Sequence, residues 1–130
     1  MNSRGRVSSG SPYEARFGFS RAVRVGDRVI AAGTAPIWDD GSCPDDAGLQ
    51  ARRCLEIIGS AVLEAGASIA DVVRTRMYIT DVADSEAVGL VHGEFFAEVR
   101  PASTMVVVAS LLDPRWRVEI EAEAIITDPG

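Results

Sequence analysis

Residues 118–124 alternate strictly between apolar side chains and glutamates, and this alternation restricts the chain to folds built on a sheet with two unlike faces. Successive side chains of a strand point to opposite faces, so a strand over 118–126 places Glu119, Glu121 and Glu123 on one face. The opposite face then carries Val118, Ile120, Ala122 and Ala124. The apolar face therefore needs a covering layer of other elements.

Periodic patterns elsewhere in the chain predict helices that can form this layer and the other strands of the sheet. Apolar residues at three- and four-residue spacing predict one helix between an N-cap at Asp45 or Asp46 and a stop at Gly66, and a second at about 85–99. Alternation predicts the remaining strands, at 17–25, 28–32, 72–80 and 104–111. The dipeptide Gly26-Asp27 predicts the turn of the first hairpin.

This order, β-β-α-β-α-β-β, predicts a single α+β domain over residues 1–130. Right-handed crossovers place both helices on one face of a mixed sheet. In the strand at 72–80, that face is expected to receive Val73, Thr75, Met77 and Ile79, with Arg74, Arg76 and Tyr78 on the other. Residues 1–11 are polar and rich in Gly and Ser, and are expected to form a flexible tail.

The strand at 104–111 predicts an oligomer. Residues 105–109 are apolar at successive positions, so both faces of this strand need burial. Two helices on one face cannot cover both. We therefore expect the other face to be covered by further copies of the chain.

Composition excludes several classes of function. A net charge of -6 and a pI near 4.7 argue against nucleic acid as a partner, because phosphate binding needs a basic surface. All 13 basic residues are arginines, so no lysine is available to form a Schiff base. The single histidine, His92, and the scattered carboxylates show no metal-ligand spacing. No metal or cofactor is therefore expected.

The expected location is the cytoplasm, with no membrane partner. No apolar run approaches the roughly 20 residues of a membrane span, and the basic start is not followed by a signal core. Cys43 lies in a Gly/Pro-rich loop and Cys54 in the apolar stripe of a helix, so a disulfide between them is not expected.

Four stretches of the chain resemble the RidA/YjgF family in order and spacing. They are Phe-Gly-Phe-Ser-Arg-Ala-Val-Arg-Val-Gly-Asp at 17–27, Ala-Gly-Thr-Ala-Pro at 32–36, the segment 71–81 that begins Asp-Val-Val-Arg-Thr, and 100–122. The last runs from Arg-Pro-Ala to Val-Glu-Ile-Glu-Ala. The resemblance covers nearly the whole chain.

The resemblance implies a chorismate-mutase-like fold assembled as a homotrimer, with the sheets in a central barrel and small-molecule clefts between subunits. It also implies hydrolysis of enamines and imines to ketoacids and ammonia, without metal or cofactor. The family's Pro-Ala-Arg-Ser motif binds the substrate carboxylate through its arginine. Here Pro101-Ala102 is followed by Ser103-Thr104.

Three more family positions differ in this chain. The resemblance aligns Phe19 with a cleft tyrosine, Ala32, just before Gly33, with a serine, and Gly89 with an asparagine. Glu119, which positions a hydrolytic water in the family, is retained. The candidate site thus consists of Glu119 as the catalytic group, and Phe19, Ala32, Gly33, Arg76, Gly89, Ser103 and Thr104 as ligand-binding positions.

Two of these residues have competing interpretations. Arg76 either restores an anion site or pairs with the glutamates of the last strand. Ser103 is a nucleophile only if a base lies within hydrogen-bond reach. The sequence places His92 in the second helix without a triad pattern, which favours a helix-surface or interface role for it.

Several functions remain open. The first is a RidA-like cleft protein without the imine deaminase activity, which binds or hydrolyses a less acidic metabolite. A non-enzymatic, chaperone-like oligomer and an active deaminase that uses Arg76 are alternatives. An endoribonuclease is disfavoured, because the chain is acidic and lacks a histidine pair for acid-base cleavage.

Overall fold

The computed structural model describes residues 4–127. The elements in chain order are β1 (Arg4–Val7), α1 (Pro12–Phe17), β2 (Ala22–Val25), β3 (Arg28–Thr34), α2 (Ala47–Glu64), β4 (Val72–Ile79), α3 (Ser85–Phe96), β5 (Ala102–Val107) and β6 (Val118–Ile125), with short 3-10 turns at Ile69–Asp71 and Val82–Asp84. The strands form one six-stranded sheet in the order β1-β2-β3-β6-β4-β5. Among the described strands only β4 and β5 are parallel neighbours, so the sheet is mixed.

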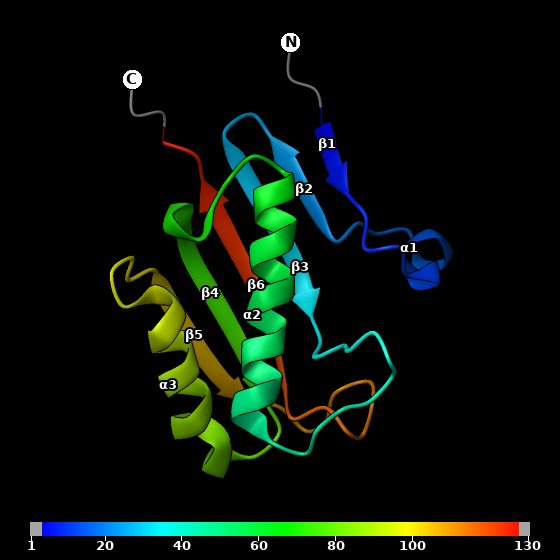
Figure 1. The fold of residues 1–130 in the computed structure, drawn as a ribbon, viewed down its shortest axis with the longest axis vertical. Coiled ribbons are helices and arrows are strands. Elements are labelled where there is room, and N and C mark those ends of the chain that lie inside the picture. Colours follow the sequence, from blue (N-terminus) through cyan, green and yellow to red (C-terminus); the bar gives the residue numbers. More distant parts are fainter. Residues whose placement is uncertain (1–3, 128–130) are drawn as a thin grey trace.

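The helices α2 and α3 lie side by side on one face of the sheet (Figure 1). α2 lies across β3 and β6, and α3 lies on the β5 side of α2. α1 lies apart from this layer, beyond the β1 side of the sheet. The mixed sheet with both long helices on one face, as predicted, is thus confirmed, and its opposite face carries no helix among the described residues.

The apolar side of β6 forms the centre of the core. Val118, Ile120, Ala122 and Ala124 are each no more than 2% exposed. They pack against α2, whose Cys54, Leu55, Ile58 and Val62 are fully buried. Glu119, Glu121 and Glu123 are partly exposed on the other face, as the alternation predicts.

The N-terminal prediction is wrong for residues 4–7. These residues form β1 and pair with β2 in antiparallel register, from Arg4 opposite Val25 to Val7 opposite Ala22. Val7 is buried and anchors the strand. Residues 1–3 of the predicted tail lie outside the described residues. The strand predicted at 17–25 is also shorter, because Ser11 caps a helix that extends to Phe17.

Two later elements deviate from the periodic pattern. A register shift between Val72 and Arg74 turns Val73 outward, where it is 42% exposed, and buries Val72 instead. β5 begins at Ala102 and ends at Val107, earlier than the predicted 104–111. α3 ends at Phe96, three residues before the predicted end at Val99.

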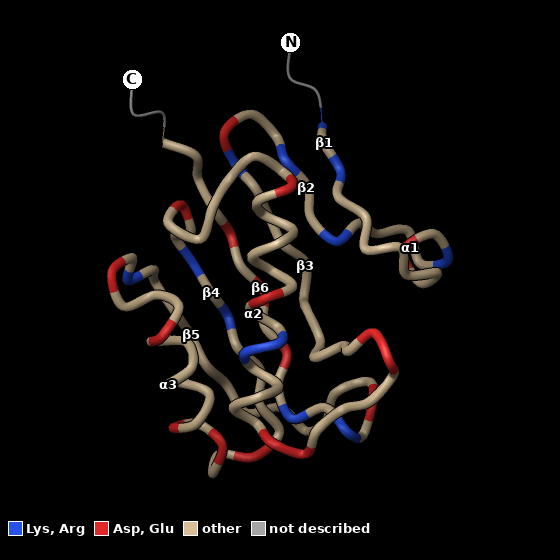
Figure 2. Tube along the Cα trace, viewed as in Figure 1, with Lys and Arg blue, Asp and Glu red and all other residues tan. Residues whose placement is uncertain are grey.

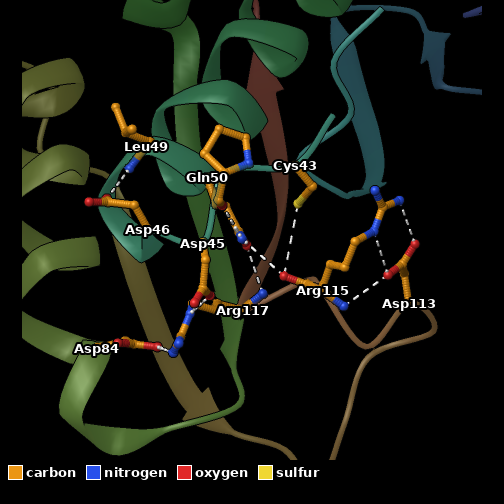
Figure 3. A network of polar contacts seen from close by, with 10 residues as sticks. Cys43, Asp45, Asp46, Leu49, Gln50, Asp84, Asp113, Arg115 and Arg117 are labelled. Atoms are coloured by element: carbon orange, nitrogen blue, oxygen red, sulfur yellow. Dashed lines mark hydrogen bonds and ion pairs between the residues drawn. The ribbon is translucent and has the colours of Figure 1, made fainter. Parts of the chain in front are cut away.

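Gln50 links the first turn of α2 to two loops that lie far apart in sequence (Figure 3). Its buried side chain donates hydrogen bonds to the carbonyl oxygens of Pro44 and Arg115, at 2.8 and 3.0 Å, and accepts one from the Arg117 N–H at 2.7 Å. Nearby, Arg117 pairs with Asp45 and Asp84. Gln50 therefore satisfies three backbone groups that sheet pairing does not satisfy.

The Gln50→Leu variant should unfold at a clearly lower urea concentration than the unmodified protein. Leucine retains the buried volume but removes the side-chain partner of three backbone groups. Only the Arg115 carbonyl keeps another contact, a weak one from Cys43 Sγ at 3.9 Å, so the loss costs roughly 2 kcal/mol or more. The free energy of unfolding measured in urea tests this. Ser60→Ala, at an exposed position of the same helix, is the control and should change stability by less than about 0.5 kcal/mol. Equal stabilities of the two variants would contradict the role of Gln50.

Candidate active site

Glu119 and Gly33 form one part of the candidate site. A Cβ at position 33 would overlap the Glu119 carboxylate, so only glycine permits this close approach. Gly33 lies in an irregular stretch of β3, where the register with β6 shifts between Ala31 and Thr34. The sequence places Ala32 in the same irregular stretch, next to Gly33.

A hollow of about 440 Å³ opens beside this carboxylate. Its walls are Gly33, Glu119, Tyr78, Glu121 and the loop at 108–112. Burial raises the pKa of Glu119, and the positive charge of Arg21 acts against that rise. A carboxyl with a raised pKa beside an open hollow is suited to proton transfer.

Arg21 was not recognised as a site residue from the sequence. Its Nη2 atom donates a hydrogen bond to the Gly33 carbonyl oxygen, and its buried Nε has no hydrogen-bond partner among the described residues. Burial lowers the pKa of Arg21, and the charges of Glu14 and Glu119 oppose this. In the sequence Arg21 lies within the strand predicted at 17–25, and nothing there indicated a role in the site.

Arg76 and Thr104 lie on the face of the sheet that the helices leave open. They occupy paired positions on β4 and β5. Arg76 Nη1 lies 3.4 Å from Glu121 Oε1, and the Tyr78 hydroxyl donates a hydrogen bond to the same oxygen. Arg76 therefore makes the glutamate pair that the sequence allowed. Arginines lie along β4, and Figure 2 shows them near the acidic positions of β6.

Ser103 lies on the opposite, helix-covered side of the sheet. It pairs with Thr75, which is fully buried, and the two hydroxyl oxygens are 2.8 Å apart. Thr75 Oγ1 lies 2.8 Å from His92 Nε2 in α3. The sequence interpretation of His92 as a surface or interface residue missed this contact. The half-buried imidazole is connected to Ser103 through one hydroxyl, and burial lowers its pKa.

The other predicted positions are more separated. Gly89 lies one turn before His92 on α3, and open space surrounds the place that a Cβ would take. Phe19 is 43% exposed after α1, and its backbone N–H is hydrogen-bonded to the Glu14 carbonyl oxygen. One chain thus places Ser103 and Glu119 on different faces of the sheet, on strands separated by β4.

The described residues include neither a membrane-spanning helix nor a group of potential metal ligands. Within residues 4–127, none of the helices combines the length and apolar character that a membrane crossing requires. In that same part of the chain, no three His, Cys, Asp or Glu side chains are grouped as potential metal ligands.

Comparison with known proteins identifies the family of this chain. The family model described as Endoribonuclease L-PSP matches residues 10–126. An uncharacterized protein of Streptomyces coelicolor is 42% identical over 120 residues, which cover 92% of this chain and 90% of that protein. The 2-iminobutanoate/2-iminopropanoate deaminase of Escherichia coli K12 is 33% identical over 112 residues, 82% of this chain and 86% of that enzyme.

A solved structure shares the fold. The crystal structure of a YjgF-family protein from Mycobacterium tuberculosis superimposes with a TM-score of 0.89 at 46% identity, over 95% of this chain and all of the other. The α+β arrangement described above is therefore the chorismate-mutase-like fold. The chain belongs to the RidA/YjgF family, some of whose members are imine deaminases.

Proposed function

We propose that this chain is a cofactor-independent cleft protein for small metabolites that does not perform the arginine-dependent imine deamination known in its family. The feature that carries the proposal is Ser103, which the sequence resemblance aligns with the family's carboxylate-binding arginine. A serine offers one neutral hydroxyl in place of a cationic group with several donors. The proposed ligand is uncharged or less acidic than an amino-acid imine, and the proposed location is the cytoplasm.

The surroundings of Ser103 support this. The Ser103 hydroxyl is hydrogen-bonded to Thr75, itself bonded to a half-buried imidazole whose lowered pKa favours the neutral form. Arg76 lies on the opposite face, against Glu121. Neither arrangement supplies a positive charge on the side of the sheet where Ser103 lies.

The proposed site is completed by a second copy of the chain. Ser103 and Glu119 are on opposite faces of the sheet, so one chain cannot bring both to the same ligand. Val106 and Val107 of the edge strand β5 are 43% and 53% exposed, and this apolar edge favours assembly. We propose a homotrimer whose clefts combine Ser103 and Gly89 of one copy with Glu119 and Phe19 of another.

An active deaminase that uses Arg76 is the second candidate. The pair with Glu121 is long, at 3.4 Å, and the side chain of Arg76 is 41% exposed. A ligand carboxylate can therefore compete for the guanidinium. A small hollow beside it is lined by Ile30, Arg74 and Glu121.

Ammonia release from imines distinguishes the two candidates. Imines of several amino acids, generated by an amino acid oxidase, should be hydrolysed by the unmodified protein no faster than in its absence. Ser103→Arg should accelerate release roughly tenfold or more, because a charge-assisted pair to the carboxylate contributes about 1.5–3 kcal/mol. Ser103→Gln, of intermediate length and no charge, should show no gain.

Rapid release by the unmodified protein would overturn the proposal. If Arg76→Gln then abolished that release, the second candidate would be correct. If Ser103→Arg and the unmodified protein were equally inactive on every imine and every neutral ester or amide tested, a non-enzymatic role would be favoured instead.

Glu119 should carry the proton transfer in the restored site. Adding Glu119→Gln to Ser103→Arg should lower the rate of ammonia release by roughly 10²-fold, because an amide cannot act as a base. Glu123→Gln, on the same face of β6, is the matched control and should leave the rate unchanged. Equal effects of both substitutions would indicate a general electrostatic influence of the strand.

The assembly is tested at the edge strand. Sedimentation velocity should give a trimer for the unmodified protein, and Val106→Glu should shift it toward monomer, because a charge would have to be buried in the contact. Leu63→Glu, at an exposed position of α2, should leave the trimer intact. A monomeric unmodified protein would refute the proposed shared cleft.

A further inference from the structure

A chain of three polar side chains crosses the layer between the sheet and α3. His92 Nε2 lies 2.8 Å from Thr75 Oγ1, which lies 2.8 Å from Ser103 Oγ. These residues come from α3, β4 and β5. The chain leads from a half-buried imidazole, through a fully buried hydroxyl, to an exposed one.

Thr75 occupies a position that core packing alone would give to valine. Its neighbours on the same face of β4, Met77 and Ile79, are buried and apolar. A buried hydroxyl without partners is costly, and Thr75 has two side-chain partners, one on each side. Both directions of proton donation along the three groups are therefore available, since each hydroxyl donates one hydrogen bond and accepts others.

His92 lies at the α3 end of this chain of side chains, where its neutral imidazole is available as a base. Desolvation by burial lowers its pKa below the ordinary value of 6.5, so the neutral imidazole prevails at neutral pH. Its ring packs on Phe96, with the centroids 4.6 Å apart. In the structure Thr75 Oγ1 donates to Ser103 Oγ, and rotation of the two hydroxyls reverses this direction. In the reversed arrangement Nε2 accepts from Thr75 and Thr75 accepts from Ser103, so the Ser103 oxygen gains nucleophilic character.

We propose that Ser103 is a nucleophile for acyl transfer from uncharged carboxylic esters, with Thr75 passing its proton to His92. The preference for an uncharged substrate rests on the function proposed above. Ser103 Oγ bonds to the ester carbonyl carbon, its proton moves through Thr75 to His92 Nε2, and the carbon–oxygen bond to the alcohol breaks. His92 returns the proton through Thr75 Oγ1 to the departing alcohol, because the Ser103 oxygen is now esterified. Water then adds to the acyl carbon and gives its proton to Thr75 Oγ1 and on to His92. The proton returns through Thr75 to Ser103 Oγ as the acid leaves.

The side chains beside Ser103 favour one kind of acyl group. Met105 and Val107 follow Ser103 at alternate positions on the same side of β5, which favours a short apolar acyl chain.

The experiment uses p-nitrophenyl butyrate and the full chain. The unmodified protein should release a burst of nitrophenol and carry a butyryl group on the peptide that contains Ser103, identified by mass spectrometry. Ser103→Ala should remove both signals. Ser60→Ala, an exposed serine of α2, is the control and should retain both.

The proton transfer from Ser103 through Thr75 to His92, here called the relay, is tested by two variants at position 75. Thr75→Val retains the shape but removes the hydroxyl, and should slow acylation by roughly 10²-fold. Thr75→Ser restores a hydroxyl and should recover most of the rate, which a structural role alone would not explain. His92→Gln retains a polar group that cannot take up a proton, and should resemble Thr75→Val.

No adduct on Ser103 of the unmodified, folded protein would overturn the inference, without depending on any variant. An adduct whose formation is equally fast in Thr75→Val and Thr75→Ser would overturn the relay. The imine assay above is separate, so failure here leaves the absence of deaminase activity standing. Rapid ammonia release with no acyl adduct would refute both proposals.

Discussion

The burial of one face of β6 beneath α2 is the interaction on which the rest of the structure depends. β6 lies between β3 and β4, so its pleat sets which side chains of both neighbours point to the helices. A slip of β6 by one residue would place its glutamates in the core, so the observed register is strongly preferred. Thr75 and Ser103 consequently face α3, whereas Glu119 faces the open side. The separation of the candidate site into two parts follows from the pleat.

Much of this architecture could be predicted from periodicity. The alternation over 118–124 and the apolar spacing of the two long helices reflect burial, and burial dominates their placement. β1 could not be predicted in this way, because Arg-Gly-Arg-Val at an edge has one buried side chain and no period. Val73 was misplaced because a bulge shifts the alternation without altering the composition.

The site could be predicted only in part. The family resemblance identified Ser103 and Glu119 by alignment, but their opposite faces follow from register. The contact of His92 with Thr75 depends on how α3 packs on the sheet, and these residues are 17 positions apart. Thr75 and Ser103 are 28 apart and meet through parallel strand pairing. Such contacts arise from tertiary packing and leave no local spacing to detect.

The contact between Gly33 and Glu119 also has an evolutionary consequence. Any side chain at position 33 would displace the carboxylate, because its first carbon would occupy the same space. Homologous chains that retain a glutamate in this place are therefore expected to retain glycine opposite it. Those that lose the glutamate are free to accept larger residues at position 33. Covariation of these two positions across relatives would thus record which lineages have kept the carboxylate in its place.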